Sequence, residues 1–283
     1  MLYKLLFRDK SNDVIFKKAF SDKVVLTQFI KDILGIDIKI KKIETDKRFR
    51  PKIAWINFAY DIFTESKDKR VIVEVQRVNY DYNFDRFLHY HTMAIAELQR
   101  SAKDYEVKQT VYTIVVITAP DVIKDRQGKA VEHDELILDF NPRTREGEVF
   151  NFCKHRLIFL NPNFKNKNTP ASYVDWFDLV LQSINHPEEP AINLKKRAIK
   201  KAATLIEEDN LTPEERHAAK IAAATEKTLS LFELKGKRYG RIEGQKENSL
   251  EIAQAMKTKG FDVEIISELT GLETETIRQI KIG

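Results

Sequence analysis

Two short stretches rich in β-branched and aromatic residues, 59–63 and 71–76, constrain the fold more strongly than any other part of the sequence. The polar segment 66–69 lies between them and has the composition of a turn. A pair of such stretches around a short polar turn predicts a β-hairpin. The rest of the chain must pack around this hairpin.

The position of the turn determines which residues face each other in the hairpin. A turn centred between positions 67 and 68 gives three opposed pairs: Thr64 with Val71, Ile62 with Val73, and Asp61 with Glu74. Opposed residues have Cβ atoms roughly 4.5–5.5 Å apart, and like charges at that separation destabilise a sheet. A strand interior is also a poor place for uncompensated acids. Either a divalent cation compensates these two carboxylates, or they face solvent and pair with lysines.

Gln76 belongs to the same face of the strand as Glu74, because side chains alternate along a strand. Val71, Val73 and Val75 fall on the other face. The hairpin would therefore present Asp61, Glu74 and Gln76 together as oxygen donors. This is the ligand chemistry that Mg²⁺ and Mn²⁺ prefer.

Several ordered motifs in the first half of the chain carry a resemblance to a known family. They are Phe16-Lys17-Lys18-Ala19-Phe20, Tyr60-Asp61-Ile62, Val73-Glu74-Val75-Gln76 and Arg86-Phe87-Leu88-His89-Tyr90. The acid, the strand with its acidic end and the helix that follows are similar to the PD-(D/E)XK nuclease superfamily. More narrowly, the set resembles the bacterial PD-(D/E)XK nuclease family transposases, also called recombination-promoting nucleases.

This resemblance implies a metal-dependent endonuclease that hydrolyses phosphodiester bonds in DNA and is associated with mobile elements or recombination. Asp61 and Glu74 would hold one or two Mg²⁺ or Mn²⁺ ions together with the backbone carbonyl of Val75. Gln76 stands where the superfamily usually has lysine. An amide cannot act as a base, so Gln76 would orient a water, and the base is either absent or a neighbour such as Lys17.

The resemblance also implies contacts to DNA. Arg86 and Tyr90 lie one turn apart on an expected helix and would flank the active site, with Arg86 and Lys17 placed for phosphate. The alternative for Arg86 is a salt bridge to Asp81 or Asp85. In the superfamily a helix before the hairpin often lends a further acid, and Asp13 is the candidate here, although it equally suits a helix cap.

The order of expected elements predicts an α/β fold. Helices are expected at 12–20, 22–34, 83–102 and 173–184, an edge strand or linker at 36–43, a buried strand at 110–119, and further strands at 131–138 and 156–160. The continuous apolar run at 110–119 is typical of a central strand covered on both faces. Together these elements fit a restriction-endonuclease-like core, a mixed central sheet flanked by helices, with an α-helical C-terminal extension.

Composition divides the chain into three parts. Residues 1–186 are expected to form the nuclease-like domain, and the Pro-rich segment 186–190 marks its end. Residues 187–245 read as a helical linker, with a strong helix start at 212–215. Residues 246–283 read as a small helix-turn-helix-like tail. Its last helix begins with two acids, so self-association or partner binding is weighed as heavily as DNA contact.

Charge and cysteine content exclude some classes of protein. The 283 residues carry 48 Lys and Arg against 43 Asp and Glu, a net charge of +5 that permits but does not demand a polyanionic partner. The single cysteine, Cys153, excludes an internal disulfide and a cysteine zinc site. No signal peptide or membrane span is evident, so a soluble cytoplasmic protein is expected.

A second class of function stays open at this point. The chain could be a catalytically inactive nuclease-fold protein that binds DNA or regulates mobile elements, because Gln76 replaces the lysine. The expected partner is DNA in both cases, with a homo-oligomer formed through the C-terminal helices as a further possibility.

Overall fold

A mixed sheet forms the centre of the first of two units in the computed structural model. The structure describes residues 12–49, 58–76, 83–99, 107–119, 122–186, 189–207, 210–215, 217–218, 221 and 248–280. Contacts between Cα atoms divide the chain into Met1–Ala223 and Ala224–Gly283. The two units are described separately below.

The sheet contains six strands among the described residues, in the order β1-β2-β3-β4-β6-β5. Their bounds are β1 Ile43–Phe49, β2 Phe58–Glu65, β3 Lys69–Gln76, β4 Thr110–Ile117, β5 Glu135–Leu138 and β6 Arg156–Leu160. Strands β1, β2 and β3 are antiparallel, β3, β4 and β6 are parallel, and β5 runs antiparallel to β6 at the edge. The parallel step from β3 to β4 needs a crossover, and helix α3 (Asn83–Ala96) lies within it.

The register of the hairpin β2–β3 is the one that the sequence predicts. Ile62 pairs with Val73 and Thr64 pairs with Val71. In the turn, the Ser66 N–H donates to the Lys69 carbonyl at 2.7 Å. The apolar pattern and the polar turn therefore suffice to fix this pairing, because a slip of one residue would exchange the two faces of the strand.

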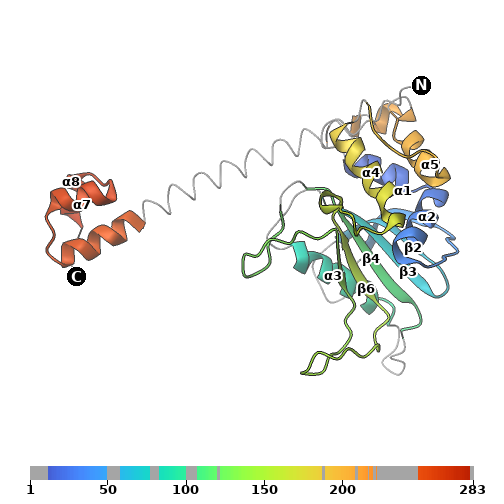
Figure 1. Cartoon of the computed structure of the whole chain (residues 1–283), viewed down its shortest axis with the longest axis horizontal. Helices are drawn as coiled ribbons and strands as arrows, with labels where there is room; N and C mark the ends of the chain where they lie inside the picture. Colours follow the sequence, from blue (N-terminus) through green and yellow to red (C-terminus); the bar gives the residue numbers. More distant parts are fainter. Residues whose placement is uncertain are drawn as a thin grey trace. The chain divides into compact units, whose positions relative to one another are not determined.

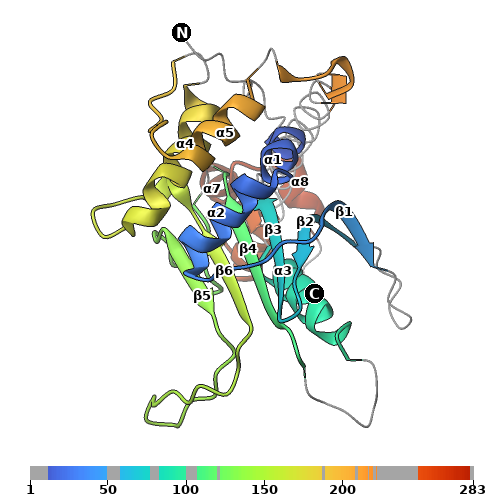
Figure 2. The same ribbon diagram turned by 90° about the vertical axis from the view of Figure 1, so that its right-hand side faces the viewer.

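Helices cover both faces of the sheet (Figures 1 and 2). One face packs against α1 (Asn12–Phe20), α2 (Lys23–Leu34), α4 (Ala171–Asn185) and α5 (Arg197–Leu205), whose apolar residues form one cluster with Val71 and Val73. The other face packs against α3, since Ile72 clusters with Ala94 and Val115 with Phe87. This confirms the expected α/β core of the restriction-endonuclease type.

The element bounds agree closely with the predicted ones on the first face. Helix α2 begins after Asp22, whose side chain accepts hydrogen bonds from the N–H groups of Val24 and Val25, and it ends at Gly35 in a left-handed conformation. Differences occur elsewhere. Helix α3 ends at Ala96, before the expected residue 102, and the edge strand begins only at Ile43, after an extended segment.

The segment after the proline-rich break differs from the helical linker that composition suggests. Its first helix, α5, packs against α1, α2 and α4 and belongs to the first unit. The predicted helix start at Thr212 forms a reciprocal capping box: the Thr212 N–H donates to the Glu215 carboxylate, and the Glu215 N–H donates to the Thr212 hydroxyl. The Glu215 carboxylate also pairs with Lys18 of α1.

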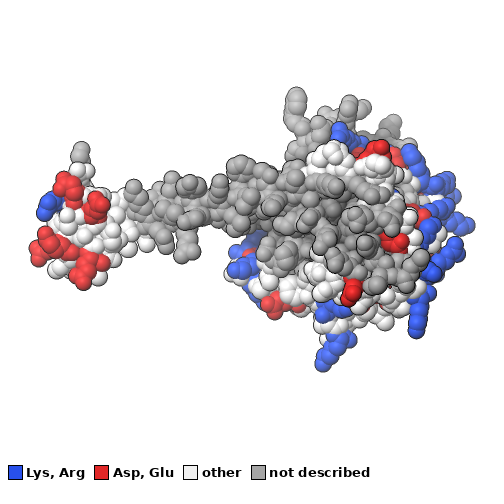
Figure 3. All heavy atoms as spheres, turned by 90° about the horizontal axis from the view of Figure 1, so that it is seen from above, with Lys and Arg blue, Asp and Glu red and all other residues white. Residues whose placement is uncertain are grey.

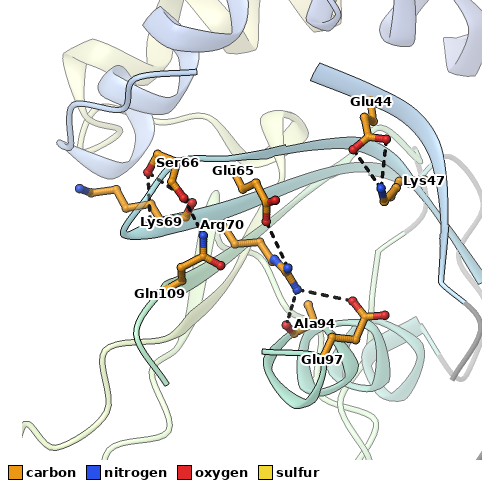
Figure 4. A network of polar contacts seen from close by, with 9 residues as sticks. All are labelled: Glu44, Lys47, Glu65, Ser66, Lys69, Arg70, Ala94, Glu97 and Gln109. Atoms are coloured by element: carbon orange, nitrogen blue, oxygen red, sulfur yellow. Dashed lines mark hydrogen bonds and ion pairs between the residues drawn. The ribbon is translucent and has the colours of Figure 1, made fainter. Parts of the chain in front are cut away.

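Three contacts fix α3 along the hairpin. At its C-terminal end, the buried Arg70 guanidinium donates to the Ala94 carbonyl at 2.9 Å and pairs with Glu97 at 3.5 Å (Figure 4). In the middle, the Tyr60 hydroxyl donates to the Tyr90 carbonyl at 2.8 Å. The third contact, near the start of α3, involves Arg86 and is described with the site.

The second unit contains helical residues 248–258, α7 (Val263–Thr270) and α8 (Thr274–Gln279). Its buried cluster consists of Ala253, Ile266 and Ile277. Gly271, with φ of 69°, caps α7 and forms the turn before α8. The helices of the predicted tail are thus present. None of the helices in the described part of the chain is long and apolar enough to cross a membrane.

Candidate active site

The carboxylates of Asp61 in β2 and Glu74 in β3 each accept a hydrogen bond from the backbone of the opposite strand. The Asp61 backbone N–H donates to Glu74 Oε1 at 3.0 Å, and the Val75 backbone N–H donates to Asp61 Oδ2 at 3.1 Å. Each carboxylate therefore binds the backbone of the opposite strand. This arrangement follows directly after the last regular pair of the ladder, Ile62 with Val73.

Glu74 is a buried acid held next to a second acid. Its residue surface is 2% exposed, and burial together with the charge of Asp61 raises the pKa of Glu74 well above its ordinary value. The hydrogen bond from Asp61 and the positive charges of Arg86 and Lys17 oppose this shift without cancelling it. A pKa raised by burial plus a defined charge partner is typical of functional sites.

Lys17 of α1 bridges two acids at this end of the hairpin. Its Nζ lies 3.2 Å from Asp61 Oδ1 and 2.7 Å from Asp46 Oδ1. Asp46 belongs to β1 and has a positive φ of 51°, and the ladder between β1 and β2 omits the pair between Asp46 and Asp61. The left-handed backbone at Asp46 thus coincides with the place where three charged groups meet.

Arg86 of α3 approaches from the other side. Its Nη1 donates to Gln76 Oε1 and its Nε to the Tyr90 hydroxyl, both at 3.3 Å. The guanidinium carbon also lies 5.2 Å from the centre of the Tyr90 ring. Burial lowers the pKa of Arg86, but the hydrogen bond to Tyr90 and the charges of Tyr90, Glu74 and Asp61 raise the pKa overall. Arg86 is therefore directed at the site. Of its two expected alternative partners, Asp85 pairs with Arg126, and Asp81 lies outside the described residues.

The donor set suits a hard divalent cation. Among the described residues, no group of three or more His, Cys, Asp and Glu could hold a metal ion. Asp61 and Glu74 form a pair of carboxylates, and a cation between them would oppose both causes of the raised Glu74 pKa. The chemistry of the residues present therefore fits Mg²⁺ or Mn²⁺ better than a metal that prefers nitrogen or sulfur ligands.

The structure links most of the residues that the sequence singles out. Contacts join Lys17, Asp61 and Glu74 in one group and Gln76, Arg86 and Tyr90 in another. The two groups are related by charge, because Arg86 lowers the pKa of Glu74. Val75 takes part through its N–H. Asp13 lies in α1, but its side chain is outside the described residues. His91 is buried with its Nδ1 2.9 Å from the Thr113 hydroxyl, on a different part of α3.

Sequence reasoning missed two residues of this region. Asp46 lies in a polar strand with no apolar alternation to place it, so no local pattern indicates that it reaches Lys17. Tyr60 looks like an ordinary core aromatic residue, yet its hydroxyl holds the turn of α3 that carries Tyr90. The position of Tyr60 directly before Asp61 is the sequence feature that could have indicated a role for Tyr60 in this region.

Comparison with known proteins gives one match. A family model described as PD-(D/E)XK nuclease family transposase matches residues 10–227, which is more than half of the chain. No curated protein and no solved structure matches.

Proposed function

Because the chain belongs to the PD-(D/E)XK nuclease family transposases, we propose that it is a metal-dependent DNA endonuclease associated with mobile elements or recombination. The observation that carries the proposal is the pair formed by Asp61 and Glu74. Two acids are held together at the end of a buried ladder, and one of them is buried. Lys17 pairs with Asp61, yet the pKa of Glu74 stays raised, so a bound cation would add compensation that the pair of acids still needs.

In this proposal Asp61, Glu74 and the carbonyl of Val75 hold the cation. When bound, Mg²⁺ or Mn²⁺ would polarise the scissile phosphate, lower the pKa of a water and offset charge on the leaving oxygen. The remaining residues bind and orient. Arg86 would hold a phosphate oxygen through its guanidinium plane, which Tyr90 supports from one side.

Gln76 and Lys17 would act on the attacking water and its proton. Gln76 accepts a hydrogen bond from Arg86, so its amide orientation is linked to the phosphate-binding group. It would orient the attacking water but cannot take a proton. Lys17 contacts Asp61 directly and would contribute positive charge near the phosphate, or assist as a base.

The distribution of charge supports a polyanionic substrate. Figure 3 shows Lys and Arg side chains gathered along one side of the first unit, the side on which α2 and α5 lie in Figure 1. Exposed lysines of these two helices include Lys23 of α2 and Lys200 of α5. The positive charge seen in this view is thus gathered on one side of the unit, which the net charge of +5 for the chain does not indicate.

A plasmid-nicking assay with Mg²⁺ or Mn²⁺ tests the proposal. We expect Asp61→Ala and Glu74→Ala each to reduce the cleavage rate at least about a hundredfold, because removing one ligand disrupts the metal site. Asp68→Ala is the matched control, an exposed acid in the turn of the same hairpin, and should cleave like wild type. Calorimetric titration of Mn²⁺ should show binding by wild type that Asp61→Ala loses.

One observation favours the second candidate function. Gln76 leaves the site without the usual lysine at that position, as expected for an inactive nuclease fold that binds DNA or regulates. This alternative predicts DNA binding with no Mn²⁺ binding that depends on Asp61. Equal nicking by wild type and both alanine variants would count against the site as assigned.

A further inference from the structure

A short two-stranded arm, residues 122–131, projects from the sheet next to α3. Its two sides are joined by a bridge between Lys124 and Ala130, by the Asp125 N–H donating to the Lys129 carbonyl at 2.9 Å, and by the Val131 N–H donating to the Ile123 carbonyl at 2.8 Å. Gly128, with φ of 80°, makes the turn. We call this segment the basic arm.

The basic arm presents positive charge. Lys124, Arg126 and Lys129 are all exposed, and the Arg126 side chain is 93% exposed. Asp125 is the one acid within residues 122–131, and its Oδ1 accepts hydrogen bonds from the N–H groups of Gln127 and Lys129, both at 2.9 Å. One carboxylate oxygen thus faces the arm's own backbone, while three cationic side chains face solvent.

The basic arm stands at the same end of the sheet as the candidate active site. Strand β4 ends at Ile117, which pairs with Gln76, and the arm begins a few residues later. Ile123 at its root packs against the cluster that contains Phe87 of α3. At its tip, Arg126 lies 3.8 Å from Asp85, the residue before Arg86. The arm is therefore attached to the helix that carries the proposed phosphate-binding arginine.

From this placement we infer that the basic arm binds the sugar-phosphate backbone of DNA on one side of the phosphate held by Arg86. The inference rests on the proposed function for the role of Arg86. Lysine and arginine contacts to phosphate position a protein on DNA without reading its sequence. The ion pair between Arg126 and Asp85 does not prevent this, because both side chains are largely exposed and such pairs contribute little.

A second arm provides a matched control. Residues 141–150 are built in the same way, with a bridge between Arg143 and Val149 and a Thr144 N–H that donates to the Glu148 carbonyl at 2.9 Å. This control arm, with the segment that follows it, carries the exposed cations Arg143, Arg145 and Lys154.

The control arm lies at the other end of the sheet. It lies between the end of β5 at Leu138 and the start of β6 at Arg156. The second residue of β6, Leu157, pairs with Thr113 of β4, which in turn pairs with Ile72 of β3, close to the hairpin turn. In Figure 1 the basic arm (green) projects beside α3, and the control arm (yellow-green) projects from the lower end of the sheet.

The test measures binding of the full chain to a labelled DNA duplex in chelator-containing buffer, so that no cleavage occurs. Affinity is measured between about 50 and 200 mM salt. The triple variant Lys124→Gln, Arg126→Gln and Lys129→Gln should bind at least about tenfold more weakly, and its slope of log affinity against log salt should fall by about 2 to 3. The control triple, Arg143→Gln, Arg145→Gln and Lys154→Gln, should keep the wild-type slope.

Three results would contradict DNA binding by the basic arm. These are an unchanged slope in the basic-arm triple, equal losses in both triples, or no salt-dependent binding by wild type. All substituted side chains are exposed, so both triples should melt like wild type, and Arg126→Gln alone should lower the slope by about 0.9. DNA binding is measured without metal and therefore does not depend on cleavage. If the wild-type protein does not cleave DNA but the basic-arm triple still binds DNA more weakly, the proposed function is wrong and the role of the basic arm stands.

Discussion

At the scale of single residues, Glu74 shows that folding and the proposed chemistry have opposite requirements. The carboxylate is buried beside Asp61, and its raised pKa means that its ionised form is disfavoured in the folded protein. A buried charge without full compensation destabilises a fold. The same charge is what would attract a cation. Glu74 is therefore expected to lower the stability of the metal-free protein while providing a ligand for the proposed site.

We expect Glu74→Gln to stabilise the metal-free protein at neutral pH. The amide keeps the shape and can still accept the hydrogen bond from the Asp61 N–H, but it carries no charge to repel Asp61. The free energy of unfolding should rise by about 1–3 kcal/mol, measured by urea unfolding with chelator present. Asp68→Asn is the control and should change little. A loss of stability in Glu74→Gln would show that the ionised acid is already fully compensated.

At the scale of elements, the site depends on how α3 lies along the hairpin. Contacts of Arg70 with Ala94, Tyr60 with Tyr90, and Gln76 with Arg86 hold the helix from its C-terminal end to its first turns. Two of these contacts, those of Arg70 and Tyr60, come from residues that lie outside the proposed chemistry. A shift of the helix would move the side chains of Arg86 and Tyr90 away from Asp61 and Glu74 together.

Glu97, next to Arg70, makes the stability of the folded protein depend on pH. Burial raises the pKa of Glu97 to about 7 from its ordinary value of 4.5, against the lowering charges of Arg70 and Lys47. Between these two values the folded state binds a proton that the unfolded state does not, so stability should fall as pH rises from about 4.5 to 7.

Thermal unfolding at several pH values measures this effect. In Glu97→Gln the fall in melting temperature over that range should be smaller, by up to about 4 °C. Glu65→Gln removes a charge that helps to raise the pKa of Glu97, so it should reduce the fall less than Glu97→Gln does. Glu132→Gln, an exposed acid away from Arg70, should keep the wild-type profile. An identical pH profile for wild type and Glu97→Gln would refute the assignment.

The elements that sequence predicts well are those with a strong local pattern. The hairpin register follows from apolar alternation and one polar turn, and α2 follows from its spacing, Asp22 and Gly35. The core of the site follows too, because Asp61 and Glu74 lie on that hairpin.

Other features depend on residues far apart in sequence. The contact of Lys17 with Asp46 spans 29 positions and needs a left-handed residue that no pattern marks. The packing of α5 on α1 and α2 and the place of the basic arm beside α3 are likewise set by tertiary contacts.

At the scale of the whole molecule, the described part of the second unit, residues 248–280, is acidic, with six Asp and Glu against three Lys and Arg. Figure 3 shows these mostly acidic side chains and the cationic side of the first unit. Helix α8 has Glu273 at its start and Glu275 in its first turn. Acids at the start of a helix repel phosphate, so the start of α8 is a poor site for a DNA phosphate.

We expect the second unit to support self-association. Within residues 248–280 three residues are buried, while Leu269 is 69% and Phe261 47% exposed, so an apolar surface remains for a second copy. Leu269→Glu, or deletion of residues 246–283, should lower the molar mass measured by light scattering. Glu268→Gln, the neighbouring exposed change, should keep the wild-type mass. A monomeric wild-type protein would contradict this role.

The hydrogen bonding of the two central acids has a consequence for the order of events in the cell. Each carboxylate accepts a hydrogen bond from the backbone of the opposite strand. The distance between the two carboxylates is therefore fixed when the hairpin forms, and it does not depend on a bound ion. A receptor for the proposed ion would therefore be preorganised, and binding would require no rearrangement of the chain. Addition of a chelator should accordingly leave the hairpin in place.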